Sequence, residues 1–368
     1  MYTSLQNYHI FFDCQGLLLQ ISPYSPFCLC ETAFCLIFAG VLHRCNVMIN
    51  LKKTFILSAF AALLVGCGGS DKPVDLDKLP LKEQIAFLDA KIRKEPKNSE
   101  LYYKRAEVLL KSEDTHEALS NIQKAVALSP KRAEYYVLQA DILFAQGETA
   151  LAFNSLQKAI EVNGKYMDAY LKSAELSLYM KDYDKVMFNI KQAMLLDKNE
   201  AKAYFIRGWA MKEQGDTLKA VADFKKAVEL KGDYEQAFEE LGNLYAVKGD
   251  GLAVEYLKST ININPKNINA MYTLALFYQE HNAQQQALDM YKRILDIKPD
   301  HADALHNVGY INYEYKHDYD VAIECFSSAI KADSTFWQAY SNRAKAYEKK
   351  GEQAKAKADM KKAAELRQ

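Results

Sequence analysis

From residue 99 to the end of the chain, apolar and small residues recur with a period of about 34. Within each period the apolar residues are spaced by three and four, which predicts two amphipathic helices and no strands. A single helical hairpin cannot bury its apolar face alone, so this period indicates a stack of hairpins. The predicted units span residues 99–132, 133–166, 167–200, 201–234, 235–267, 268–301, 302–336 and 337–368.

Two positions of each unit carry small residues, which would let the two helices of a hairpin approach closely. The eighth residues are Ala106, Ala140, Ala174, Gly208, Gly242, Ala275, Gly309 and Ala344. The twentieth residues are Ala118, Ala152, Val186, Ala220, Ala253, Ala287, Ala322 and Ala356. Large residues occupy the fourth and twenty-fourth positions, such as Tyr136 and Leu156 in the second unit. We expect this alternation of large and small side chains to form the core.

Helix-breaking residues lie where turns are expected. Glycines fall between the two helices of four units, and prolines fall between units. These residues are Gly147, Gly215, Gly249 and Gly351, and Pro130, Pro265 and Pro299. Unit five is one residue short near residues 249–251 and unit seven is one residue long near 316–320. We expect turns to absorb both changes.

This combination of features resembles the tetratricopeptide repeat family over about three quarters of the chain. The resemblance implies an all-α fold, a right-handed solenoid of about eight helical hairpins that binds proteins and requires no cofactor or metal. One departure is the seventh position, commonly Leu in the family, which is polar in five units: Arg105, Gln139, Ser173, Arg207 and Arg343. The helices must pack differently there.

Both ends of the repeat array are expected to be covered. Residues 81–98 predict a capping helix, since Ile85, Leu88 and Ile92 follow helical spacing. The last predicted helix carries Lys355, Lys357, Lys361 and Lys362 and can face water itself.

Residues 48–66 have the layout of a secretory signal, because Lys52 and Lys53 precede an apolar run over 55–65. The run is too short for a membrane span, which needs about 20 residues. It ends in Leu64-Val65-Gly66-Cys67, which resembles the lipobox of bacterial lipoproteins. The resemblance implies a lipid on Cys67, a flexible tether over 67–80 and a place in the cell envelope. Gly68 after the cysteine favours the outer membrane over the inner. An ordinary signal peptide with a coincidental cysteine is the alternative.

Residues 1–47 precede this signal, although a signal peptide should begin a chain. Our hypothesis is that translation starts at Met48 and that residues 1–47 are a non-native extension. The rival interpretation is a genuine membrane-associated extension. Its cysteines Cys28, Cys30, Cys35 and Cys45 have no common zinc-site spacing.

Composition and motifs argue against several functions. Lys plus Arg and Asp plus Glu are both 47, so no basic field would attract nucleic acid. Cys325, the one cysteine of the repeat region, cannot form a disulfide framework and is expected to be a small buried residue. His301, His306 and His317 lack metal-ligand spacing, and no catalytic motif occurs. We predict that the chain is not an enzyme.

The fifth and ninth positions fall on one face of the first helix of each unit, which lines the concave surface in this family. The fifth residues of units one to four are Tyr103, Val137, Leu171 and Phe205. The ninth residues are Glu107, Asp141, Glu175 and Trp209. This pattern predicts an apolar stripe beside an acidic row, suited to a partner segment with basic and apolar residues. A merely solvated acidic face is the alternative.

A second candidate surface in units six and seven is aromatic and nearly uncharged, as interface hot spots often are. It comprises Tyr272, Leu276, His306, Tyr310 and Tyr313. Chaperone-binding members of the family clamp a terminal carboxylate with Lys and Asn where this chain has Tyr103 and Glu107, so that ligand is disfavoured. We predict a membrane-anchored scaffold for protein–protein interaction in the bacterial cell envelope. The alternatives are a peptide- or carbohydrate-binding lipoprotein that uses the Tyr-rich groove and, disfavoured, an enzyme.

Overall fold

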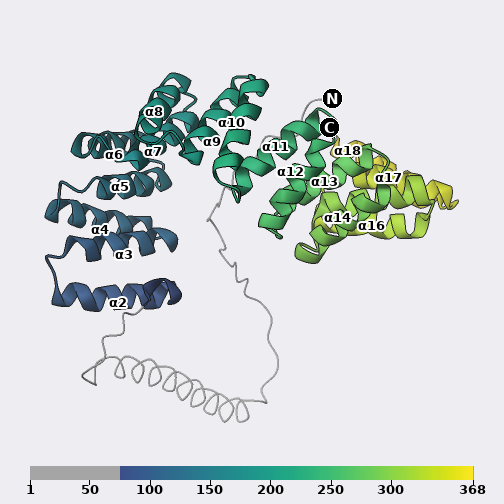
Figure 1. Ribbon diagram of the computed structural model, residues 1–368. Coiled ribbons are helices and arrows are strands. Elements are labelled where there is room, and N and C mark those ends of the chain that lie inside the picture. The colour runs from purple at the N-terminus through teal and green to yellow at the C-terminus, as the bar shows by residue number, and fades with distance from the viewer. Residues whose placement is uncertain (1–74, 368) are drawn as a thin grey trace, which may run out of the picture. The chain divides into compact units, whose positions relative to one another are not determined.

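Helices are the only regular elements in residues 75–367, the part of the chain that the computed structural model describes (Figure 1). A short 3₁₀ turn (Leu76–Lys78) and helix α2 (Leu81–Lys94) come first, and eight helical hairpins follow. The predicted all-α stack with an N-terminal capping helix is confirmed. The predicted extension (1–47), signal peptide (48–66) and lipidated Cys67 lie outside the described residues.

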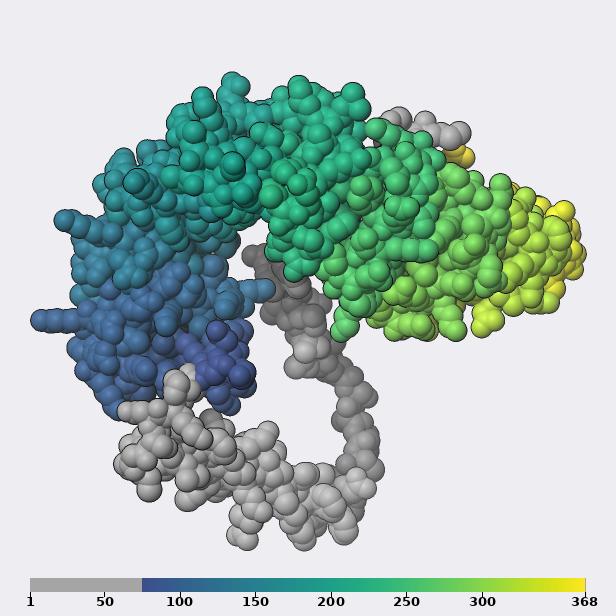
Figure 2. All heavy atoms as spheres, in the orientation of Figure 1, coloured from purple at the N-terminus to yellow at the C-terminus, as the bar shows by residue number. Residues whose placement is uncertain are grey.

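Each hairpin consists of a first and a second helix that pack side by side, and each hairpin contacts the next one along the chain. The colours in Figure 2 accordingly change without interruption from purple to yellow along the hairpins. The pairs are α3 (Ser99–Lys111) with α4 (Thr115–Leu128), α5 (Ala133–Ala145) with α6 (Thr149–Val162), α7 (Met167–Tyr179) with α8 (Tyr183–Leu196), α9 (Ala201–Glu213) with α10 (Thr217–Leu230), α11 (Glu235–Val247) with α12 (Leu252–Ile263), α13 (Ile268–Glu280) with α14 (Gln284–Ile297), α15 (Ala302–Ile311) with α16 (Tyr319–Ala332), and α17 (Trp337–Lys349) with α18 (Gln353–Leu366).

Each hairpin turns through one residue with left-handed backbone geometry. Glycine supplies it at Gly147, Gly215, Gly249 and Gly351, with φ between 67° and 82°. The other four turns use Glu113, Lys181, Asn282 and His317, with φ between 54° and 64°. Several second helices then begin at an aspartate whose carboxylate accepts a backbone N–H, as Asp182 does from Lys185 at 3.2 Å. A residue in the left-handed conformation is therefore common to all eight hairpin turns.

The small residues at the eighth position lie against the large residues at the twenty-fourth. A Cβ atom on Gly208 would lie 2.8 Å from the ring of Phe224, and one on Gly309 would lie 2.8 Å from the ring of Phe326. Both phenylalanines are fully buried. The glycines are thus required by the close approach of two helices. In the eighth hairpin the residue at this position, Met360, is 42% exposed.

Three of the five polar residues at the seventh position, Gln139, Arg207 and Arg343, pair with the residue sixteen places later on the second helix. The guanidinium of Arg207 donates to the carboxylate of Asp223 at 2.6 and 2.8 Å. Gln139 accepts a long hydrogen bond of 3.5 Å from the hydroxyl of Ser155. Arg105 instead bonds Asp89 of the capping helix at 2.7 Å and Glu117 at 2.6 Å. The departure from Leu is therefore compensated across the hairpin.

The extra residue of unit seven is absorbed differently from the expectation. It produces a π-helical turn (Asn312–Lys316) at the end of α15, before the left-handed His317. The buried amide of Asn312 donates to the carbonyl of Val308 at 2.8 Å. The insertion thus widens the end of a helix and does not lengthen the loop after it.

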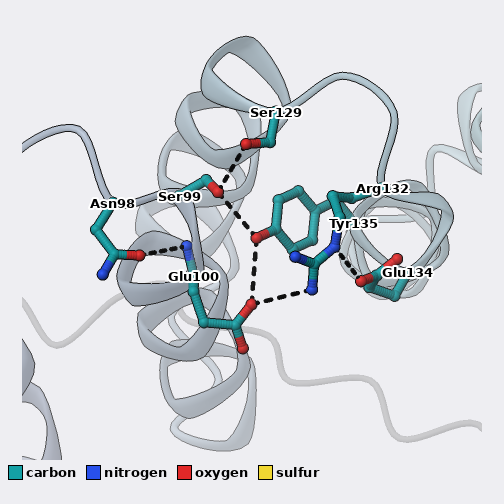
Figure 3. Close-up of polar contacts among 7 residues, drawn as sticks. All are labelled: Asn98, Ser99, Glu100, Ser129, Arg132, Glu134 and Tyr135. Carbon is teal, nitrogen blue, oxygen red and sulfur yellow. Dashed lines mark hydrogen bonds and ion pairs between the residues drawn. The ribbon is translucent and has the colours of Figure 1, made fainter.

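Hydrogen bonds and ion pairs link the first two hairpins at the start of their first helices (Figure 3). The carboxylate of Glu100 accepts from the guanidinium of Arg132 and from the hydroxyl of Tyr135, each at 3.3 Å. Ser99 Oγ lies 2.9 Å from Ser129 Oγ and 3.1 Å from the same tyrosine hydroxyl. Because Tyr135 has no exposed surface, these bonds satisfy its buried hydroxyl.

The capping helix covers the first hairpin as predicted, since Leu88 is 1% exposed and packs with the buried Leu101 and Val108. Among the described helices, none is long and apolar enough to cross a membrane.

Candidate partner-binding surface

The first helices of consecutive hairpins contact one another directly in the pairs α3 with α5, α5 with α7, α7 with α9, and α11 with α13. Their fifth, ninth and twelfth positions therefore contribute to one side of the repeat array. Both predicted rows of candidate residues lie on these helices.

The fifth-position residues do not form an open apolar stripe. Val137 and Leu171 are each only 4% exposed, so they belong to the core. Tyr103 and Phe205 are half-buried, and Tyr103 stacks on Tyr135 with ring centroids 5.0 Å apart. The stripe fails because the inter-hairpin contact covers the fifth position, while the helical period alone cannot tell a covered face from an open one.

The ninth-position acids pair with lysines of the next hairpin. A carboxylate oxygen of Asp141 lies 3.0 Å from Lys172 Nζ, and one of Glu175 lies 3.0 Å from Lys202 Nζ. Burial raises the pKa of the Asp141 carboxyl, although Lys172 opposes this shift. Burial of the ammonium acts to lower the pKa of Lys172, but attraction to Asp141 outweighs it and the pKa is raised. The acidic row is thus half-buried and bridges hairpins.

The row ends differently at its two ends. Glu107 has no cationic partner within ion-pairing distance in residues 75–367, and its charge adds to burial in raising the pKa of Tyr103. Trp209 lies under the ammonium of Lys212, 4.4 Å from the ring centroid, and that ammonium also bonds Glu240 at 2.6 Å. Glu107 is therefore the acid most available to a cationic ligand.

A cavity of about 280 Å³ opens between α5, α6 and α7, beside the acidic row. Its lining includes Asp141, Glu175 and Lys172, and two aromatic residues, Phe144 and Tyr179, that sequence reasoning missed. Phe144 is 41% exposed and Tyr179 is 68% exposed, and their rings meet edge to face at 5.1 Å. The sequence could have predicted Phe144, because it occupies the twelfth position of its unit, on the same helix face as the fifth and ninth positions. We call this cavity with its two rings the inner pocket.

The second candidate surface is largely occupied by a hydrogen-bond network. Asn307 Nδ2 donates to the hydroxyls of Tyr272 and Tyr291 at 3.2 and 3.1 Å. His306 Nδ1 lies 3.2 Å from Asn307 Oδ1, and its Nε2 lies 3.0 Å from Asn342 Nδ2. Burial raises the pKa of Tyr272 to about 12 and lowers that of His306. These side chains join three hairpins.

The rest of this second surface is more open. Leu276, Tyr310 and Tyr313 are half-buried, and Tyr313 contacts Tyr319 with ring centroids 5.7 Å apart. Tyr310 lies near the end of α15 and Tyr313 in the π-helical turn that follows it, whereas Leu276 lies on α13. The structure therefore divides the second candidate set into network residues and partly accessible aromatic residues.

The other residues considered for chemistry lie apart. His301 Nδ1 accepts the backbone N–H of Ala304 and caps α15, while His317 occupies an exposed turn. Cys325 is half-buried, and burial raises its pKa to about 11. Across residues 75–367, no group of three or more His, Cys, Asp or Glu side chains could hold a metal ion.

Known proteins share the repeat pattern. A family model described as tetratricopeptide repeat matches residues 103–169 and 310–368, and a second model with this description matches residues 201–234. The BBSome complex member BBS4 of Bos taurus is 28% identical over 153 residues, which cover 41% of this chain and 29% of that protein. The mitochondrial import receptor subunit TOM70 of Homo sapiens is 25% identical over 168 residues, which cover 43% and 28% respectively. The chain thus spans under a third of these relatives.

Two solved structures of repeat proteins align with this chain. The human IFIT1 dimer aligns with a TM-score of 0.51 at 16% identity, over 78% of this chain and 68% of that one, and this likeness concerns the fold alone. The structure of MamA aligns with a TM-score of 0.41 at 28% identity, over 44% of this chain and 94% of that one.

Proposed function

Because the chain belongs to the tetratricopeptide repeat family, whose members generally act as scaffolds, we propose that it binds a protein segment with basic and apolar side chains at the inner pocket. One observation carries this proposal: two exposed aromatic rings, Phe144 and Tyr179, lie beside the carboxylates of Asp141 and Glu175. An apolar side chain of the partner would pack on the rings. A Lys or Arg next to it would reach the free side of a carboxylate.

Charge favours a cationic partner even though lysines pair with two of the acids. Both side chains are still partly exposed, 34% for Asp141 and 40% for Glu175, so a further donor can approach them. Glu107 adds an acid that no described cation neutralises. The three ninth-position acids therefore outnumber the two lysines that pair with them, and this excess of one negative charge favours basic segments.

The test measures binding of the full chain to an array of synthetic peptides, each with a central Phe or Leu. In one set this residue is flanked by Lys or Arg, and in the other by Asp or Glu. The test variant is Phe144→Leu with Tyr179→Ala, which copies the residues Leu178 and Ala145 at the same positions of neighbouring units. Charge reversal of Asp141 is avoided, since it would also break the pair with Lys172. The control variant is Leu218→Ala, at a residue 78% exposed on α10.

We expect basic apolar peptides to bind best and to lose at least about tenfold in affinity with the double variant, since aromatic anchors contribute roughly 2 kcal/mol. Glu107→Gln should weaken binding further. Preference for acidic peptides, or equal binding by wild type and the double variant, would overturn the proposal.

We also propose that this scaffold is held in the bacterial cell envelope, at the outer membrane, by lipid on Cys67. The support is the order of Lys52 and Lys53, an apolar run and Leu64 to Cys67 in the sequence. Several acyl chains would anchor firmly, since each buried CH2 contributes about 0.8 kcal/mol. Metabolic labelling with an alkyne fatty acid should label the wild type but not Cys67→Ala. On cell fractionation, Cys67→Ala should no longer be found in the membrane fraction. An unlabelled wild type, or an abundant mature peptide from residues 1–47, contradicts this.

A further inference from the structure

The outward face of α8, the second helix of the third hairpin, differs from the same face of every other hairpin. It carries Phe188 and Leu195, which are 59% and 72% exposed. They are seven residues apart and so lie on one side of the helix, two turns from each other. Such a pair of exposed large apolar residues is costly to leave in water.

The chain's own repeats show that the fold does not require these residues. Counted from the small residue at position twenty, Phe188 and Leu195 occupy positions twenty-two and twenty-nine of their unit. The seven other units have Ala or a polar residue at both positions, for example Asn154 with Glu161 and Asp289 with Asp296. Eight copies of one hairpin therefore provide seven internal controls, and unit three departs from all of them.

A cavity of about 350 Å³ lies on the same side of this hairpin. Its lining is apolar apart from two cations, and comprises Met187, Ile190, Lys191, Met194, Leu195 and Arg207. Methionine side chains adapt their shape to an inserted group, which suits a binding surface. The volume is at the lower end for ligand pockets and fits one or two side chains.

The charges around this cavity select the partner. Asp223 neutralises Arg207 through bonds of 2.6 and 2.8 Å. Lys191 is exposed, and no carboxylate of residues 75–367 lies within ion-pairing distance of it. No acidic side chain lines the cavity. Its free charge is therefore positive, opposite to that of the inner pocket.

We propose that Phe188, Lys191, Leu195 and the adjoining cavity, together the outer patch, bind a segment of another protein that presents a large apolar side chain next to an Asp or Glu. The apolar side chain enters the cavity among Met187, Ile190 and Met194. The carboxylate of the partner pairs with Lys191 Nζ. The inner pocket is lined by α5, α6 and α7 and the cavity of the outer patch by α8 and α9, and the two share no lining residue, so the scaffold can hold a basic and an acidic partner at once.

The test selects peptides from a displayed random library on the full chain and counter-selects them on a variant. The variant is Phe188→Asn with Leu195→Glu, which installs the residues of unit two, so folding should be retained and circular dichroism checks it. Lys191→Gln, which copies Gln157 of unit two, tests the charge separately. The matched control is Leu218→Ala.

We expect the patch-dependent peptides to combine a Phe, Leu or Trp with an Asp or Glu. Their affinity should fall at least tenfold in the double variant, fall about three- to tenfold in Lys191→Gln, and stay unchanged in Leu218→Ala and in the inner-pocket variant. The proposal is overturned if no patch-dependent peptides emerge, if they are basic, or if Lys191→Gln binds them as wild type does. It is also overturned if the double variant abolishes self-association or vesicle binding of the chain, since a second copy or a lipid surface would then be the occupant.

Discussion

Arg343 on α17 bonds the carboxylate of Asp359 on α18 with both Nε and Nη2, at 2.7 and 2.8 Å. A third donor, Nη1, bonds Ser327 Oγ of the preceding hairpin at 2.9 Å. The same two positions hold Leu274 and Met290 in the sixth hairpin. A polar pair and an apolar pair are thus interchangeable solutions at one place in the fold.

The first prediction follows from that exchange. Asp359→Ala should lower the free energy of unfolding by roughly 1 to 3 kcal/mol, because it leaves a guanidinium that is only 18% exposed without its carboxylate. Arg343→Leu with Asp359→Met should restore most of this loss. The free energy of unfolding is measured by urea denaturation followed by the fluorescence of Trp337. The measurement uses a Trp209→Phe background, so that Trp337 is the one tryptophan left. A double variant less stable than the single one would contradict the exchange.

The second prediction concerns the close approach at Gly208. Gly208→Ala would place a Cβ 2.8 Å from the buried ring of Phe224, and this overpacking should outweigh the helix propensity gained. We expect a net loss of roughly 1 to 2 kcal/mol in thermal unfolding followed by circular dichroism. Gly232→Ala is the control, since nothing lies within 4 Å of its Cβ and its effect should be within about 0.5 kcal/mol.

The third prediction uses the left-handed turn residues. Glu113 has φ 64°, where glycine has no steric cost. Glu113→Gly should therefore raise the free energy of unfolding by up to about 1 kcal/mol. Removing the Cβ relieves the steric cost of the left-handed conformation, and the greater chain entropy of glycine in the unfolded state offsets part of that gain. Glu113→Ala keeps the Cβ and should give no gain. Differential scanning calorimetry of the three proteins compares them, and an equal gain from Ala would refute the conformational explanation.

The fourth prediction is a pH dependence centred on His306. The ring faces the amides of Asn307 and Asn342 and the rings of Phe326 and Phe336, and the nearby acid is Asp303. The bonds require a neutral ring, with Nδ1 donating to Asn307 and Nε2 accepting from Asn342. Burial lowers its pKa in the folded state, although Asn307 and the acid oppose this.

The sign follows from this lowered pKa. The unfolded histidine, with a pKa of about 6.5, binds a proton more readily than the folded one, so stability is full above about pH 6.5 and falls as the pH decreases. Unfolding at pH 5 to 8, followed by Trp337, should show this slope in the wild type and a smaller slope in His306→Phe, where His301, whose pKa burial also lowers, still contributes. His317→Asn, in an exposed turn, should keep the slope; loss of the slope there would show that His306 is not the titrating group.

Which parts of this fold could be predicted depended on the distance over which a residue acts. A small residue at the eighth position, such as Ala106 or Gly208, is needed for the close approach of two helices within one hairpin. Because this need recurs in every unit, the hairpins and their order could be predicted from the sequence. The left-handed Glu113 could not be predicted, because its side chain does not favour that geometry. The ion pair of Arg207 with Asp223 could not be predicted for a different reason. The two residues are sixteen positions apart, and only the packing of the two helices of the hairpin brings them together.

The candidate site was harder to predict than the fold. Asp141 and Glu175 were correctly placed on the first helices, yet their lysine partners come from the next hairpin. Val137 and Leu171 have the spacing expected of an open face but are buried. The helical period shows which side of the helix a residue lies on, but not whether a neighbouring helix covers that side. Phe144 and Tyr179 became visible as one feature only when α5 and α7 were side by side.

The ion pairs between hairpins also govern how such a chain can lengthen. Unit three has a lysine at its sixth position, Lys172, and an acid at its ninth, Glu175, so a duplicated copy would offer its lysine to the acid of the original. Unit four has Ile206 and Trp209 at those positions and could not pair with itself. Tandem duplication of the third hairpin would therefore lengthen the row of charges, whereas duplication of the fourth would add no ion pair to it.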